Sequence, residues 1–192
     1  MRYILTALLL FITAAVFAQK DVVLVKSEIY KIVYSQSLQQ PIKIDYIVLC
    51  HGVGVSRKGM DFYTNDTIKT SDYLDYANNQ YDKGHMAPAA DFNCTKEMLF
   101  KTFSYLNCAL QEQYLNRGVW KELEEHEREL AKKYKVYVQI LCLFDEKSIK
   151  LKTGATVPTG FYKTIKYDKT LENYYFPNIK PEKKKYSDYR IK

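Results

Sequence analysis

The chain is 192 residues long, enough for one compact domain and too short for two typical ones. Apolar residues make up 47% of it and charged residues 27%, a balance that excludes an intrinsically disordered chain. The formal net charge of +7 favours a polyanionic partner: nucleic acid, an anionic glycan or a membrane surface. Charge alone does not choose among these three.

The first 18 residues have the composition of a signal peptide. Arg2 supplies the positive start, residues 4–17 are apolar apart from two threonines, and Val16-Phe17-Ala18 fits the rule for cleavage after Ala18. A retained anchor is the less favoured alternative, since the run is shorter than the ~20 apolar residues of a spanning helix. We therefore expect an exported protein, periplasmic or extracellular, with no membrane attachment once mature. The mature chain would carry 28 basic and 22 acidic residues, a net charge of +6.

Strand patterns come next along the chain. Apolar alternation and β-branched residues predict strands over Val22–Val25, Ile29–Tyr34 and Ile42–Cys50. A long polar stretch, 51–80, follows them. Irregular segments of this length in compact domains are commonly functional loops.

Helical spacing then replaces the alternation. Thr95 can cap a helix that runs to about Leu106, and a longer helix is predicted from about Arg117 to Tyr134. Its buried stripe is expected to comprise Trp120, Leu123, Leu130 and Tyr134. Strands are predicted again at Val136–Phe144 and near Phe161–Tyr167. Residues 181–192, which include three consecutive lysines, are expected to form a basic, solvated C-terminal tail.

This order of elements predicts an α+β fold with a central antiparallel sheet flanked by helices. The domain is expected to span 19–180, between the leader and the tail. The chain lacks the regular strand–helix alternation of a doubly wound fold, and it has no Gly-rich dinucleotide or phosphate-loop signature.

Four cysteines occur in the sequence: Cys50, Cys94, Cys108 and Cys142. In an exported chain they could form two disulfides, with three possible pairings. Four reduced, buried thiols are the alternative. No two of them show the C-x-x-C spacing of a structural zinc site.

The most informative segment is Tyr81-Asp82-Lys83-Gly84-His85-Met86-Ala87-Pro88. Histidine is the side chain whose ordinary pKa lets it take up a proton near neutral pH. The preceding glycine allows a tight backbone that other residues resist. The segment is therefore suited to presenting an imidazole in a cleft, although a structural histidine is the simpler interpretation of any lone histidine.

Further motifs follow this segment in a fixed order: Asn107, Gln111, Leu115-Asn116-Arg117-Gly118-Val119-Trp120, Leu123-Glu124 and Arg128. Together with Asp82-Lys83-Gly84-His85 they resemble the DNA/RNA non-specific endonucleases, the sugar-nonspecific ββα-metal nucleases that include endonuclease G. Gln40-Pro41 and Val157-Pro158-Thr159 look like early and late strand motifs of the same family. The resemblance covers most of 30–178, and it implies the ββα-metal nuclease fold.

The resemblance also implies roles for individual residues. The implied catalytic residues are His85 as general base, Lys83, Glu124 and Arg57; the implied metal ligand is Asn116; the implied substrate-binding residues are Asp82, Asn107, Gln111 and Arg128. The metal would be one Mg²⁺, with Mn²⁺ or Ca²⁺ as substitutes, because magnesium keeps several waters and often takes few protein ligands. Glu124 would hold a metal-bound water.

Each of these roles has a structural alternative. Asn116 could be a helix N-cap, and Glu124 could be an i,i+4 surface partner of Arg128. Arg57 could be a solvated surface arginine. For Asn107 and Gln111 the alternative is ordinary capping of a helix end or loop.

The sequence departs from the family pattern at two positions. Lys83 stands where the family usually has arginine, which keeps the charge but loses the planar two-pronged guanidinium. Leu110 stands where a proline is usual. The first departure makes lower activity or an altered substrate preference conceivable, and the second concerns the local shape of the chain.

The resulting hypothesis is an exported, Mg²⁺-dependent endonuclease that cuts DNA and RNA with little sequence preference and leaves 5′-phosphates. A basic nucleic-acid-binding protein of the same fold that has lost catalysis is the alternative, supported by Lys83. A third hypothesis is a nuclease that serves as a secreted toxin with an immunity or inhibitor partner, and it ranks below a nutritional or scavenging role. A homodimer is compatible with the sequence.

Overall fold

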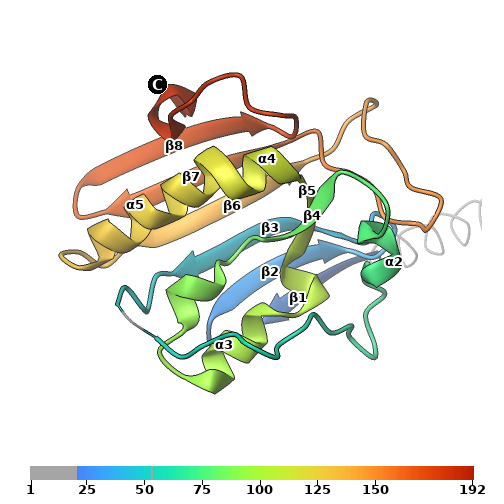
Figure 1. Cartoon of the computed structure of the whole chain (residues 1–192), viewed down its shortest axis with the longest axis horizontal. Coiled ribbons are helices and arrows are strands. Elements are labelled where there is room, and N and C mark those ends of the chain that lie inside the picture. Colours follow the sequence, from blue (N-terminus) through green and yellow to red (C-terminus); the bar gives the residue numbers. More distant parts are fainter. Residues whose placement is uncertain (1–20, 53) are drawn as a thin grey trace, which may run out of the picture.

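The computed structural model describes residues 21–52 and 54–192, and the expected signal peptide lies outside them. A seven-stranded, fully antiparallel sheet forms the body of the molecule, in the order β1-β2-β3-β6-β7-β8-β9 (Figure 1). Its strands are β1 (Val22–Lys26), β2 (Tyr30–Ser35), β3 (Gln40–Ile47), β6 (Tyr137–Leu143), β7 (Gly160–Tyr167), β8 (Thr170–Pro177) and β9 (Arg190–Ile191). This confirms the α+β prediction.

A second, two-stranded sheet lies in front of the large one. Its strands, β4 (Tyr81–His85) and β5 (Cys108–Glu112), pair antiparallel, and the predictions above contain neither of them. The chain leaves α3 (Lys96–Thr102) earlier than the predicted helix end at Leu106 and enters β5 through the short turn η2 (Tyr105–Asn107). Thr95 does cap α3, accepting from the Met98 backbone N–H.

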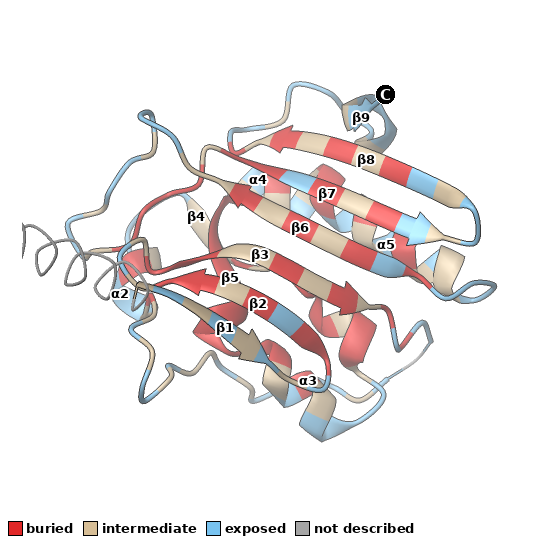
Figure 2. Cartoon of the chain, turned by 180° about the vertical axis from the view of Figure 1, so that it is seen from behind, coloured by how far each residue is buried: buried red, intermediate tan, exposed pale blue. Residues whose placement is uncertain are grey.

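Helical segments cover one face of the large sheet, and Figure 2 shows the other face with no described helix across it. The covering elements are α2 (Tyr73–Tyr76), η1 (Ala89–Phe92), α3, α4 (Gln113–Leu115), η3 (Asn116–Trp120) and α5 (Lys121–Ala131). The core lies between these layers. Trp120 of η3 packs against Phe161 and Phe176 of the sheet, with ring centroids 5.4 and 5.5 Å apart.

The predicted long helix is correct in its core face and wrong in its ends. Trp120 and Leu123 are fully buried, as expected, whereas Tyr134 is 43% exposed and follows the end of α5 at Ala131. The helical region begins at Gln113 rather than Arg117, because Glu112 acts as the cap and accepts from the Leu115 backbone N–H. Asn116 lies inside this helical region, so its interpretation as the N-cap is wrong.

The expected solvated tail is partly folded. Residues 186–189 form the 3₁₀ turn η4 (Tyr186–Tyr189), and β9 pairs with β8. The Tyr189 ring stacks on Phe176 at 4.7 Å, which supplies the apolar contact that fixes this segment. Most of its lysines remain exposed.

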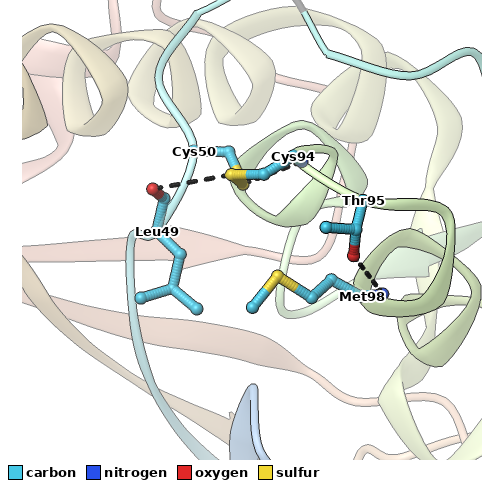
Figure 3. Close-up of a disulfide and its surroundings, with 5 residues drawn as sticks. All are labelled: Leu49, Cys50, Cys94, Thr95 and Met98. Atoms are coloured by element: carbon cyan, nitrogen blue, oxygen red, sulfur yellow. Dashed lines mark hydrogen bonds between the residues drawn. A yellow bond between two sulfur atoms is a disulfide. The ribbon is translucent and has the colours of Figure 1, made fainter.

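One disulfide closes the segment between β3 and α3. Cys50, just after β3, bonds to Cys94, just before α3 (Figure 3). Cys108 and Cys142 are buried free thiols. The two cysteines of the bond are 44 residues apart in sequence, and the segment between them contains both the long polar stretch and β4. Spacing alone had left this pairing open. No described helix is both long and apolar enough to cross a membrane.

Candidate active site

The β4–β5 pair sets the geometry of the site through Gly84. In the pairing, Gly84 lies opposite Ala109 and His85 opposite Cys108. A Cβ at residue 84 would lie 2.5 Å from Gln111 Oε1 and 2.7 Å from its Cβ, closer than side chains approach. Glycine is therefore required here by the close approach of Gln111, and it places the next residue, His85, at the end of the strand.

The His85 ring is enclosed by aromatic side chains. Its centroid lies 4.7 Å from that of Phe62 and 5.0 Å from that of Phe103, the latter edge-on. Nε2 is buried and has no hydrogen-bond partner in the described structure. Burial, and secondarily the positive charge of Arg57, lower the pKa of His85 to about 3. The imidazole is therefore neutral at neutral pH, the form that can accept a proton.

Two cations flank this imidazole. Arg57 is exposed on the loop before β4 and is close enough to His85 to depress its pKa. Lys83 lies two residues before His85 on the same strand, with Nζ 3.2 Å from Asp61 Oδ1 and 5.4 and 5.7 Å from the ring centroids of Phe62 and Tyr105. Positive charges beside a neutral base suit a phosphate substrate.

A separate cluster joins β4 to the helical region through Asp82. Asp82 Oδ2 accepts from Asn116 Nδ2 at 2.9 Å, and its two oxygens accept from Arg117 Nε and Nη2 at 2.8 and 2.6 Å. The structure therefore brings Asn116 to Asp82, on the strand that carries His85. Asp82 and His85 are three residues apart in sequence. Asn116 begins η3, a π-type turn in which Gly118 has non-helical dihedrals, and such turns are frequent at functional sites.

The Asn116 side chain suits the implied metal. Because its amide nitrogen donates to Asp82, its carbonyl oxygen is the atom left for a hard cation. Among the described residues, no group of three or more His, Cys, Asp or Glu side chains could form an all-protein cage. A single carboxamide supplemented by waters is the donor set that the resemblance implies; Asn116 carries such a carboxamide, and its role as metal ligand stays a prediction.

Glu124 and Arg128 lie deeper, in a cluster of charges between α5 and the sheet. Arg128 Nη1 donates to the buried Asp91 at 2.8 Å, so the expected surface pair between Glu124 and Arg128 is wrong. Burial raises the pKa of Glu124 to about 7, against the nearby positive charge of Lys163. Arg128 is thus committed to Asp91, and its substrate-binding role stays a prediction.

The remaining predicted residues are both fully buried. The Asn107 amide accepts from the Ala87 N–H and donates to the carbonyls of Ala87 and Thr102, which fixes the turn after His85. Both amide atoms of Gln111 are buried without a partner in the described structure. Any effect of Asn107 on substrate would pass through the backbone that it holds, whereas Gln111 retains its full hydrogen-bonding capacity beside Gly84.

The backbone N–H of Leu110 makes a contact that a proline, which lacks this group, could not make. It donates to Gln40 Oε1 at 3.0 Å, tying β5 to β3. The departure from the family pattern at this position therefore has a structural partner in Gln40. Prediction from sequence missed Arg117, Asp61 and Phe62 as site neighbours; only Arg117, adjacent to Asn116 and one of few arginines, carried a visible signal.

Fold and site together describe a basic α+β domain with a neutral histidine, an Asn116 amide held by Asp82, and cations beside the histidine. A sequence model described as DNA/RNA non-specific endonuclease matches residues 12–192. The chain belongs to this family.

Individual relatives are nucleases. The chain is 31% identical over 143 residues to mitochondrial endonuclease G of Bos taurus, which covers 64% of this chain and 48% of that protein. It is 35% identical over 129 residues to nuclease C1 of Cunninghamella echinulata var. echinulata, covering 59% and 51% respectively. The chain spans about half the length of the curated relatives that it matches.

A solved structure shows the same fold. The chain superposes on a chain from the crystal structure of the EndoG/EndoGI complex with a TM-score of 0.77 at 26% identity. The match covers 88% of this chain and 80% of that one. This confirms the predicted fold class.

Proposed function

We propose that this chain is a metal-dependent endonuclease that hydrolyses phosphodiester bonds of DNA and RNA with little sequence preference. The observation that carries the proposal is a neutral, enclosed His85 on the same strand as Asp82, the carboxylate that orients the Asn116 amide. Family membership and the nuclease relatives support it. We propose Mg²⁺ as the ion.

In the proposed reaction, His85 removes a proton from a water that attacks phosphorus. Its imidazole is in the neutral, proton-accepting form at neutral pH, and burial makes it a weaker base than an exposed histidine. A cation held at Asn116 Oδ1 would supply charge stabilisation at the departing 3′ oxygen. The P–O3′ bond breaks and the departing 3′ oxygen takes a proton from solvent, so the products carry a 5′-phosphate and a 3′-hydroxyl.

The other residues bind and orient. Arg57 and Lys83 flank the base and would contact non-bridging phosphate oxygens. Asp82 holds the Asn116 amide in one orientation. Backbone contacts of this kind carry no direct sequence information, which suits non-specific cutting.

Export to the periplasm or the extracellular space is proposed from the leader sequence alone. Two relatives are named mitochondrial endonuclease G, and that location is said of those proteins. Because EndoG was solved with EndoGI, we also propose that a protein inhibitor could cover this site. Assembly as a homodimer is a further proposal, to be tested by the mass of the purified protein in solution.

The test is cleavage of plasmid DNA and of RNA by the purified mature chain, with and without EDTA. We expect both substrates to be cut, EDTA to stop cutting, and His85→Ala to lower the rate by at least ~10²-fold. The matched control is His51→Ala, which removes an exposed histidine outside the site. Labelling of the products with polynucleotide kinase before and after phosphatase identifies the 5′ ends.

Three results would count against the proposal. Intact nucleic acid in every lane, with a folded protein, would remove the catalytic function. A mobility shift without cleavage would favour the alternative, a binding protein that has lost catalysis. A His85→Ala rate close to that of the parent would mean that another residue activates the water.

A further inference from the structure

The C-terminal arm, residues 178–192, carries much of the positive charge of the molecule. It contains six basic and two acidic side chains, a net charge of +4 against +7 for the whole chain. Its basic members are Lys180, Lys183, Lys184, Lys185, Arg190 and Lys192. The prediction of a solvated tail over 181–192 gives this charge no role.

The start of the arm is fixed against the site-bearing strands. Asn178 is buried; its Oδ1 accepts from the Glu112 N–H at 2.8 Å, and its Nδ2 donates to the carbonyls of Leu110 and Pro158, both at 2.8 Å. Glu112 and Leu110 belong to β5, the partner strand of β4. The arm therefore leaves the sheet at a point tied to the strand pair that holds His85.

Aromatic contacts fix the rest of the arm. Tyr189 stacks on Phe176, and Tyr186 stacks on His126 of α5 with centroids 5.3 Å apart. Pairing of β9 with β8 closes the segment. The arm is thus a folded part of the domain, and its lysines project from a defined backbone.

The arm also adjoins the helical turn that carries Asn116. Lys180 Nζ lies 4.9 Å from the ring centroid of Tyr114, two residues before Asn116. A hollow of about 260 Å³ is lined by Leu115 together with arm residues that include Lys183 and Tyr189. Figure 1 shows the arm passing from the end of β8 close to α4.

Several cations of the arm are not committed to a carboxylate. Lys184 and Lys185 are exposed and have no side-chain partner in the described structure. Lys180 contacts only the ring of Tyr114, which is itself 55% exposed. By contrast, Arg190 lies 3.7 Å from Glu172. Exposed, unneutralised ammonium groups beside a phosphodiesterase site match the charge of a nucleic-acid backbone.

We propose that the C-terminal arm is a second phosphate-binding surface, which holds the nucleic-acid strand beyond the bond being cut through Lys180, Lys184 and Lys185. This inference rests on the proposed function for its substrate class. Through Tyr114 and Leu115 the arm adjoins the helical turn that carries Asn116. Its contacts would be made to the backbone and would not depend on base sequence.

The test compares two triple variants in the His85→Ala background, measured by fluorescence anisotropy with a labelled DNA duplex across a salt series. The arm variant is Lys180→Gln, Lys184→Gln and Lys185→Gln. The matched control is Lys26→Gln, Lys31→Gln and Lys166→Gln, which removes the same charge from the uncovered face of the sheet. We expect the arm variant to reduce the slope of log affinity against log salt by about two to three units, and the control to change it by less than about one.

Cleavage kinetics of the same triple variants with His85 restored separate this inference from the proposed function. The arm variant should raise KM for a long duplex, leave kcat unchanged, and leave cleavage of a short oligonucleotide unaffected. Equal slopes in the arm variant and the control, or an arm variant identical to the parent, would overturn the inference while leaving cleavage intact. Binding with the expected slope difference but without cleavage would support the arm and overturn the proposed nuclease activity. A parent that binds no nucleic acid would overturn both.

Discussion

Asp82→Asn is the substitution that most directly tests how the site is organised. Asp82 accepts three hydrogen bonds, from Asn116 Nδ2 at 2.9 Å and from Arg117 Nε and Nη2 at 2.8 and 2.6 Å. An asparagine at position 82 has only one acceptor oxygen. If that oxygen stays with Asn116, the new NH₂ faces the Arg117 guanidinium; if it turns away, the NH₂ faces the Asn116 amide nitrogen and favours a flipped Asn116.

The expected effect is a loss of metal affinity. Partners that orient a ligand typically contribute 10- to 100-fold in metal affinity or activity, which corresponds to about 1.4–2.7 kcal/mol. The Arg117 contact contributes little to stability by itself, since that guanidinium is 67% exposed and such pairs give at most about 1 kcal/mol. Asp82→Asn should therefore shift the Mg²⁺ dependence of cleavage far more than it lowers the free energy of unfolding.

The assay is the rate of plasmid cleavage as a function of Mg²⁺ concentration, together with urea unfolding of the same proteins. We expect the half-maximal Mg²⁺ concentration to rise about 10- to 100-fold. The matched control is Asp66→Asn, which removes an exposed carboxylate from the loop before β4 and should leave the curve in place. An unchanged Mg²⁺ curve for Asp82→Asn would refute the argument that Asp82 sets the orientation of Asn116.

Three further predictions concern a buried ion pair, the His85 ring and the disulfide. Lys163 and Glu127 are fully buried with Nζ and Oε1 2.6 Å apart, so Lys163→Met should cost about 3–5 kcal/mol in urea unfolding, and adding Glu127→Leu should recover at least about 2 kcal/mol; equal losses in the single and double variants would contradict this. The pKa of His85 is lowered to about 3 in the folded state, so stability should fall by up to about 1.4 kcal/mol per pH unit between pH 6.5 and 3, where only the unfolded ring takes up a proton. In His85→Asn that part of the slope should be missing, and a parallel pH profile would count against an enclosed neutral ring. Removing the Cys50–Cys94 bond by double Ser substitution should lower the free energy of unfolding by about 4 kcal/mol for its 44-residue separation, and an unchanged denaturation midpoint would show that the bond does not constrain the unfolded chain.

Five strands of the large sheet, β1, β2, β3, β6 and β7, were predictable because they obey a simple rule, whereas β8 and β9 were not predicted. Residues such as Ile32, Ile44 and Ile140 are fully buried and alternate with half-buried neighbours, since one face packs on the helices and the other is uncovered. The core face of α5 followed from helical spacing for the same reason. In both cases a single buried face requires apolar residues at a regular spacing, and this spacing is visible in the sequence.

The strands of the site were not predictable by that rule. In β5 all five residues are buried, so no alternation of buried and exposed positions marks it as a strand. In β4 the residues are Tyr81, Asp82, Lys83, Gly84 and His85, which have low strand propensity apart from the tyrosine. Their pairing comes from the close approach of Gln111 over Gly84 and from contacts made elsewhere in the fold.

The charged partners were beyond local reasoning for a related reason. Spacing of four residues suggested that Glu124 and Arg128 form a pair, yet Arg128 bonds Asp91, 37 residues away in sequence. A fully buried carboxylate needs a cation more than a half-buried one does, because desolvation makes an unpaired buried charge costly. Long-range burial therefore decided the partner, and sequence spacing carries no information about it.

The lysine at position 83 connects the site to the arm. Arginine, usual there in the family, would grip a phosphate with two parallel hydrogen bonds, whereas the Lys83 ammonium offers a point charge already shared with Asp61 at 3.2 Å. Weaker binding of the reacting phosphate leaves a larger share of the substrate affinity to distant contacts with the nucleic-acid backbone, such as those proposed for the arm. Lys83→Arg should then lower KM for a long duplex by about fivefold, the value of one added charge-assisted bond near 1 kcal/mol at an accessible site.

The same change should also reduce what is lost when the arm is neutralised. In a double-mutant cycle, the arm variant Lys180→Gln, Lys184→Gln and Lys185→Gln should raise KM less in the Lys83→Arg protein than in the parent. The reason is that tighter binding of the reacting phosphate leaves a smaller share of the substrate affinity to the arm. Urea unfolding of all four proteins controls for stability, since residue 83 also lies over the Phe62 ring. Strictly additive effects on KM would show that the two surfaces bind independently. A higher KM for Lys83→Arg would show that Phe62 and Asp61 accommodate the ammonium better than a guanidinium.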